Sequence, residues 1–134
     1  MADPKHILLI DDDPDIHHAV SAMLEPKGFR LTCSLTGPDG VAAARKDRPD
    51  LILLDIMLSS PSEGFHLAYD LSKDDELKDI PIIMISSIGS MMGMDYAREL
   101  GTDYVRAEKF LDKPLDTKTL TAAIDEVLKK SPPK

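Results

Sequence analysis

The chain has 134 residues, of which 24 are acidic and 16 basic, and its net charge at pH 7 is −8. This length fits one domain with its own core, and the acidic balance disfavours direct binding to nucleic acid or to an anionic membrane. The single cysteine, Cys33, lies in an apolar-leaning run, so we expect a core thiol in a reducing cytoplasm.

The first half of the chain predicts three strands and two helices. An apolar run over 7–10 predicts a strand, and Asp13 and Pro14 then supply a helix cap and a first-turn proline. Helical spacing continues to Lys27, so we expect one helix that ends at Gly28. The next elements are a strand over 29–34, an alanine-rich helix that opens at 37–40 and stops before Pro49, and a strand over 51–54.

The second half predicts two more strands and three more helices. A loop over 59–64 leads to a helix over about 65–71 and a charged, solvated connector over 73–79. The following elements are a strand over 80–85, a helix over about 91–100 closed by Gly101, a polar irregular stretch over 102–109, a strand from Phe110, and a helix whose buried stripe is Leu120, Ile124, Val127 and Leu128. We assign 1–130 to one domain and 131–134 to a tail or the start of a linker.

This alternation of strands and helices predicts a doubly wound α/β fold. Five strands would form an open parallel sheet, and right-handed crossovers would place the five helices on both of its faces. Strands buried on both faces read as continuous apolar runs, as these do. No apolar run approaches the roughly 20 residues of a membrane span, and the first residues lack a signal-peptide pattern, so we expect a cytoplasmic protein.

Chemically useful side chains follow three of the strands. Asp11 and Asp12 come after the first strand, Asp55 after the third, and Lys113 after the last. Parallel strands present ligand groups just beyond their carboxyl ends, so these side chains should meet at one edge of the sheet. Carboxylates gathered there repel one another, and a hard divalent cation with a lysine beside it relieves the repulsion. Such a site suits an incoming phosphoryl group.

The order of these motifs resembles that of the receiver domains of two-component response regulators. Asp11-Asp12, Asp55, Ser86 and Lys113-Pro114 match the family's pattern nearly end to end. The resemblance implies a flavodoxin-like receiver fold and a phosphoacceptor that is not a conventional enzyme. The phosphoryl group would come from a histidine kinase, a phosphotransfer protein or a small acyl phosphate, and the signal would pass to a downstream protein or output domain.

The resemblance also implies a role for each matched residue around a Mg²⁺ ion. Asp55 would accept the phosphoryl group and contact the metal. Asp12 would bind the metal directly, Asp11 mostly through water, and Met57 through its backbone carbonyl. Magnesium prefers octahedral oxygen coordination and keeps several waters, so this ligand set would suffice.

Three further positions are implied to sense or hold the phosphoryl group. Lys113 would give it a positive charge, and a cis Lys113–Pro114 bond is expected. Ser86 would hydrogen-bond one phosphoryl oxygen, and its movement would be coupled to that of Phe110, the aromatic switch residue. Ser87 could also serve as the donor, although the distance from Pro81 favours Ser86.

Two positions near the matched residues affect the lifetime of the phosphorylated form. Met57 and Ile88 occupy positions that often orient the hydrolytic water, and neither holds water well, so slow self-dephosphorylation is expected.

The chain also departs from the family pattern in two segments. Ser59 stands where the family has proline, and the stretch between Gly101 and Phe110 is longer than the common form.

Two other functions compete with this interpretation. In a haloacid-dehalogenase-like phosphatase, Asp11 would be the nucleophile and Asp13 the general acid. That family expects threonine where Asp15 stands, and the chain is short for a cap domain. A receiver fold that docks partners without phosphorylation would not need the complete set of acids, serine and lysine.

His17 and His18 are adjacent on a helix and point apart, so we interpret them as surface or partly packed histidines.

Overall fold

The sheet of this protein has five parallel strands in the order β2-β1-β3-β4-β5. The computed structural model describes residues 5–55, 67, 70, 71, 73–86, 109–112 and 115–130. The strands are β1 (His6–Ile10), β2 (Arg30–Ser34), β3 (Leu51–Asp55), β4 (Ile82–Ser86) and β5 (Lys109–Asp112). This strand order is the flavodoxin-like one, and it confirms the predicted doubly wound α/β fold.

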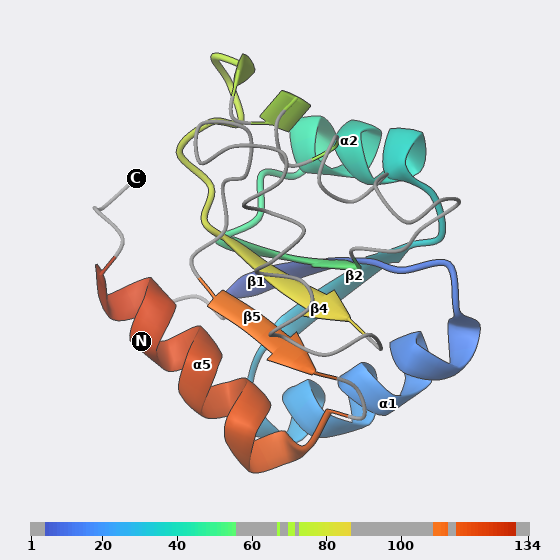
Figure 1. Cartoon of the computed structure of the whole chain (residues 1–134), viewed down its shortest axis with the longest axis vertical. Helices are drawn as coiled ribbons and strands as arrows, with labels where there is room; N and C mark the ends of the chain where they lie inside the picture. Colours follow the sequence, from blue (N-terminus) through green and yellow to red (C-terminus); the bar gives the residue numbers. More distant parts are fainter. Residues whose placement is uncertain are drawn as a thin grey trace.

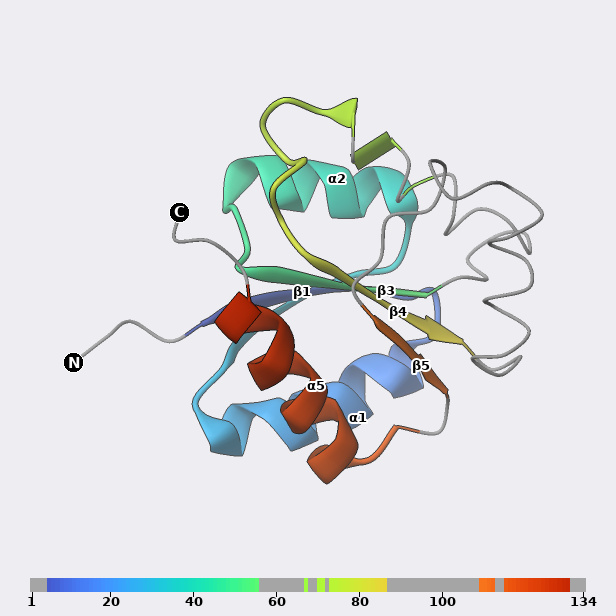
Figure 2. The ribbon, with the colours of Figure 1, turned by 60° about the vertical axis from the view of Figure 1, so that its left-hand side comes forward.

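Helices cover both faces of the sheet. The described α-helices are α1 (Pro14–Leu24), α2 (Gly37–Lys46) and α5 (Thr117–Lys130). In Figures 1 and 2, α2 lies over one face of the sheet while α1 and α5 lie side by side over the other. Residues 67, 70 and 71 of the helix predicted over 65–71 are helical, whereas the helix predicted over 91–100 falls outside the described residues. None of the helices described is both long and apolar enough to cross a bilayer.

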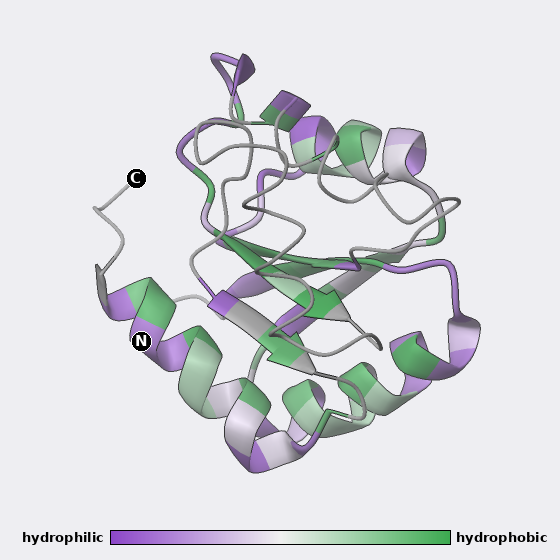
Figure 3. Ribbon diagram, in the orientation of Figure 1, coloured by the Kyte–Doolittle hydropathy of each residue, from purple (hydrophilic) through white to green (hydrophobic). Residues whose placement is uncertain are grey.

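The core consists of two apolar layers separated by the sheet. Successive residues of a strand point to opposite faces, so Leu8 and Ile10 pack toward α2 while Ile7 and Leu9 pack toward α1 and α5. Figure 3 shows the apolar strands at the centre and polar residues on the outer sides of the helices. The layer between the sheet and α1 and α5 contains the buried residues Ile7, Leu9, Val20, Leu24, Leu51, Leu53, Ile83, Ile85, Leu120, Ala123, Ile124 and Val127.

The helix predicted to run to Lys27 is shorter in the structure. The α-helix ends at Leu24, and a 3₁₀ turn, η1 (Glu25–Lys27), follows it. Pro26 is the cause, since proline lacks a backbone N–H and its ring clashes with the carbonyl four residues earlier in a continuing α-helix. Gly28 still ends the helical segment, with a left-handed φ of 88°.

Cys33 is exposed, so the expectation of a core thiol is wrong. It lies on β2, an edge strand of the sheet whose only neighbouring strand among the described residues is β1. Partial burial and the nearby Glu25 carboxylate raise the pKa of the Cys33 thiol, which lowers its thiolate fraction and its reactivity.

The segment expected to be a solvated connector, 73–79, is mostly exposed but contains one buried residue. Leu77 is 2% exposed, and it belongs to the apolar layer under α2 together with Ile80, which follows the segment. Arg45 of α2 pairs with Asp74 and Glu76, which ties this segment to the helix. The prediction of a solvated segment therefore holds for most of its charged side chains, and Leu77 is the exception because it packs in the core.

The last described helix begins at a capping residue beyond β5. The Asp116 carboxylate accepts a hydrogen bond from the backbone N–H of Thr119 at 2.8 Å and another from its hydroxyl at 2.8 Å. These bonds lower the pKa of Asp116, with the backbone N–H making the larger contribution. The cap fixes the start of α5 close to the end of β5.

Gly40 allows α2 to approach the end of β1. A Cβ atom at this position would lie 2.6 Å from Cγ1 of Ile10, which is closer than two carbon atoms can pack, and it would also strike Cδ1. Ile10 is fully buried and directly precedes Asp11.

We predict that Gly40→Ala destabilises the protein by about 1–3 kcal/mol, because the added methyl group overpacks the α2 layer. Urea unfolding followed by circular dichroism measures this loss. Ile10→Val removes the Cδ1 atom and should recover part of the stability in the double variant. Simple addition of the two single losses would contradict the proposed steric cause.

Candidate functional site

Two aspartates end neighbouring strands at the same level of the sheet. In the parallel pairing of β1 with β3, Ile10 lies opposite Leu54, so Asp11 and Asp55 are the next residues on each strand. Both strands are completely buried over their apolar residues. The register of the sheet therefore carries these two side chains to one point on its carboxyl edge.

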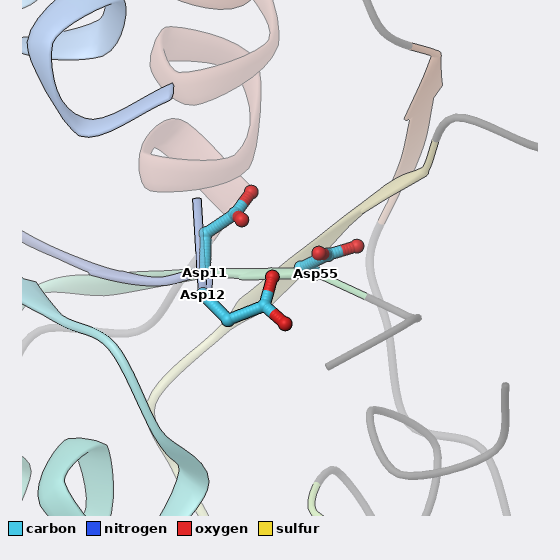
Figure 4. Close-up of side chains that lie close together, drawn as sticks. All are labelled: Asp11, Asp12 and Asp55. Atoms are coloured by element: carbon cyan, nitrogen blue, oxygen red, sulfur yellow. The ribbon is translucent and has the colours of Figure 1, made fainter. Parts of the chain in front are cut away.

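Asp12 joins them to form an acidic cluster. One carboxylate oxygen from each of Asp11, Asp12 and Asp55 lies within 4.8 Å of the other two. Figure 4 shows the three side chains together, with Asp11 and Asp12 leaving the end of β1 in different directions and Asp55 beside them. Asp11 is fully buried and Asp55 is 3% exposed, whereas Asp12 is exposed. The structure thus brings together the acids that the strand-end pattern singled out.

The loop from β1 to α1 is held by its own hydrogen bonds. Asp13 caps α1, and its Oδ1 accepts the backbone N–H of Asp15 at 2.9 Å. The backbone N–H of Asp13 in turn donates to Oδ1 of Asp11 at 3.0 Å. The third acid of the Asp11–Asp13 run therefore serves the helix, as the capping pattern predicts, while the first two face Asp55.

His17 contacts this loop, which the sequence did not suggest. Its Nε2 lies 2.5 Å from the backbone carbonyl oxygen of Asp11, and the side chain is half-buried. His18 is exposed, so the interpretation of the pair as surface or partly packed histidines holds. The signal that could have identified His17 is its place in the first turn of a helix that directly follows the acidic run.

The other strand ends converge on the same edge. Asp55 lies opposite Ile85, and Ser86, the last residue of β4, lies opposite Asp112, the last residue of β5. Lys113 is the next residue in the chain. Met57, Lys113 and Pro114 lie outside the described residues, as do the side chains of Ser86 and Phe110; the Phe110 backbone lies in β5 opposite Met84.

The acidic cluster has the chemistry of a site for a hard divalent cation. Carboxylate oxygens are the ligands that Mg²⁺ prefers, and oxygens on opposite sides of the ion lie about 4.2 Å apart at its usual bond length. Separations of up to 4.8 Å therefore suit one ion that some carboxylates bind directly and others through water. Asp11 and Asp55 are buried and Asp12 is exposed, so such an ion would remain accessible from solvent on the Asp12 side.

Comparisons with known proteins identify the family. Residues 7–125 match the response regulator receiver domain. Protein PilH of Pseudomonas aeruginosa is 34% identical over 122 residues, which cover 91% of this chain and 96% of PilH. The phosphate regulon transcriptional regulatory protein PhoB of the same species is 33% identical over 129 residues, and the match covers 96% of this chain but 54% of PhoB.

Comparison with solved structures identifies the same family. A crystal structure of a CheY-like response regulator receiver domain protein from Methanospirillum hungatei superposes with a TM-score of 0.78 at 26% identity, covering 96% of both chains. The match in sequence spans nearly the whole described sheet, and the match in structure reproduces its topology. The chain therefore belongs to the receiver domain family of two-component response regulators, whose members are phosphoacceptor signalling domains.

Proposed function

We propose that Asp55 accepts the phosphoryl group and that Asp11 and Asp12 help to hold the Mg²⁺ that the transfer requires. The observation that carries this proposal is the buried Asp55 carboxylate at the end of the central strand β3, within 4.8 Å of both other acids. A carboxylate oxygen of Asp55 would attack phosphorus in line while the bond from phosphorus to the donor's nitrogen or oxygen breaks. When bound, Mg²⁺ would neutralise negative charge on the phosphoryl oxygens.

The environments of the two neighbouring acids support different roles. Asp12 is exposed and can reach an ion directly. Asp11 is fully buried, and one of its oxygens already accepts the Asp13 N–H. This contact supports a role for Asp11 mostly through bound water, with the backbone carbonyl of Met57 as the remaining protein ligand.

Lys113 and Ser86 would hold the transferred group, and Phe110 would pass on the signal. The positive charge of Lys113 would stabilise the phosphoryl oxygens, and we expect a cis Lys113–Pro114 bond. A hydrogen bond from Ser86 to the phosphoryl group would shift the equilibrium between two positions of Phe110, and with it the surface available to a partner. The alignment of β4 and β5 at Ser86 and Asp112 supports this arrangement.

The proposed partners are proteins. A histidine kinase or phosphotransfer protein would donate the phosphoryl group, and a downstream protein or output domain would read the result. The chain spans about half the length of most of the transcriptional regulators it matches, which include the DNA-binding regulator RpaA of Synechocystis. We place the receiver domain at 1–130. Because the whole chain has a net charge of −8, this domain would act in the cytoplasm without binding DNA itself.

The contacts of Asp13 argue against the phosphatase alternative. In that mechanism Asp13 would be the general acid, yet its carboxylate caps α1 by accepting the Asp15 N–H. Oδ1 of Asp11, the nucleophile of that alternative, accepts the backbone N–H of Asp13. Asp55 is the better-placed acid, because it lies on the central strand with both neighbours beside it.

Treatment with acetyl phosphate and Mg²⁺ should add one phosphoryl group to the wild-type protein and none to Asp55→Asn, which lacks the nucleophilic oxygen pair. Intact mass spectrometry measures both. Labelling of the asparagine variant would move the nucleophile to another acid, with Asp11 the first candidate. Absence of labelling in the wild type would favour a docking module that works without phosphorylation.

Mg²⁺ should stabilise the wild-type protein, because the folded state binds the ion and the unfolded chain does not. At a concentration 100 times the Kd, the expected gain is about 2.7 kcal/mol. Asp12→Asn should lose most of this gain, and without Mg²⁺ it should be more stable than the wild type because one repelling charge is gone. Asp15→Asn is the matched control, since Asp15 is an exposed acid near the cluster but not part of it. Thermal unfolding with and without Mg²⁺ gives all three comparisons.

The phosphorylated form should be long-lived, because Met57 and Ile88 cannot orient an attacking water. Met57→Asn places an amide at one of these positions and should shorten the lifetime by roughly tenfold or more. Phosphate loss from purified, labelled protein at neutral pH with Mg²⁺ is the measurement. A wild-type half-life of seconds would contradict this prediction.

A further inference from the structure

We propose that His17 is a positioning residue that holds the peptide group between Asp11 and Asp12 in the orientation needed for Mg²⁺ binding. This inference rests on the proposed function of the acidic cluster. Nε2 of His17 lies 2.5 Å from the carbonyl oxygen of Asp11. A carbonyl oxygen can only accept, so the hydrogen is on Nε2, and the side chain acts as a donor.

Helix geometry explains why His17 reaches this oxygen and His18 does not. His17 is the fourth residue of α1, which begins at Pro14. Side chains of a helix lean toward its N-terminus, so a residue in this turn covers the loop that precedes the helix. The next residue is rotated by about 100° around the axis. His18 accordingly points elsewhere and is exposed.

The hydrogen bond from His17 is important because it restrains the peptide group between Asp11 and Asp12. The carbonyl of Asp11 and the N–H of Asp12 belong to one planar peptide group. A hydrogen bond to that oxygen therefore limits rotation of the whole plane, and this plane sets the directions in which both acidic residues leave the backbone. His17 would thus act on two carboxylates at once without touching the metal.

Other bonds hold Asp11 from different sides. Its backbone N–H donates to the carbonyl of Ser34 on β2 at 3.1 Å, and its Oδ1 accepts the N–H of Asp13 at 3.0 Å. These bonds restrain the end of the strand and the Asp11 carboxylate. His17 adds a restraint from α1 on the peptide that leads to Asp12, the exposed acid of the cluster. Loss of His17 should therefore loosen the site without unfolding it.

Three variants test this role. His17→Leu removes the donor, His17→Gln keeps an amide N–H near the place of Nε2, and His18→Leu is the matched control on the neighbouring position. Leucine and glutamine both favour helices at least as much as histidine, so a loss of helix stability would not explain an effect. Isothermal titration calorimetry with Mg²⁺ alone measures the affinity, and circular dichroism checks the fold.

We expect His17→Leu to bind Mg²⁺ roughly tenfold more weakly, as is usual when a group that orients metal ligands is removed. His17→Gln should recover most of the affinity, and His18→Leu should match the wild type. Wild-type affinity in His17→Leu, or equal losses in His17→Leu and His17→Gln, would overturn the proposal even if Asp12→Asn abolishes binding. A lower melting temperature without Mg²⁺ but unchanged affinity would mean that His17 is only structural. No Mg²⁺ binding by the wild type would overturn both this role and the proposed metal site.

Discussion

The close approach of three carboxylates at the end of two neighbouring buried strands is the constraint on which the site depends. When both are ionised, two carboxylates whose oxygens lie within 4.8 Å of each other repel by on the order of 3 kcal/mol or more at an effective dielectric constant of about 20. If these carboxylates were on unrestrained loops, they would move apart and the repulsion would be relieved. Here the β1–β3 register fixes Asp11 and Asp55 at the same level, so the two residues cannot move apart, and a bound cation would offset the repulsion.

The scaffold supports this arrangement from both faces of the sheet. On one face, Gly40 lets α2 pack closely against Ile10, the residue that precedes Asp11. On the other face, Asp13 caps α1 and donates its backbone N–H to the Asp11 carboxylate, and His17 in the first turn of α1 contacts the Asp11 carbonyl. The end of β1 is therefore held by packing on the α2 face and by hydrogen bonds on the α1 face. A preorganised metal site requires such restraints.

The matched region occurs in proteins of different length. PilH is matched over nearly its whole length, whereas PhoB and RpaA are matched over about half of theirs. A receiver domain can serve in both settings because its chemistry lies at the carboxyl edge of the sheet. Attached segments need not contribute to the acidic cluster, which this chain forms from its own residues.

The sequence by itself determined the alternation of strands and helices, the parallel sheet and the three acids of the cluster. Apolar runs mark buried strands, and the ends of parallel strands must share an edge, so Asp11, Asp12 and Asp55 could be grouped without coordinates. Only the tertiary structure decided that Cys33 is exposed and that His17 contacts Asp11. The exposure of Cys33 depends on the position of β2 at an edge of the sheet. The contact of His17 with Asp11 depends on the orientation of α1 relative to the end of β1. Neither property is contained in local spacing, because both arise from neighbours that are distant along the chain or from the path of a loop.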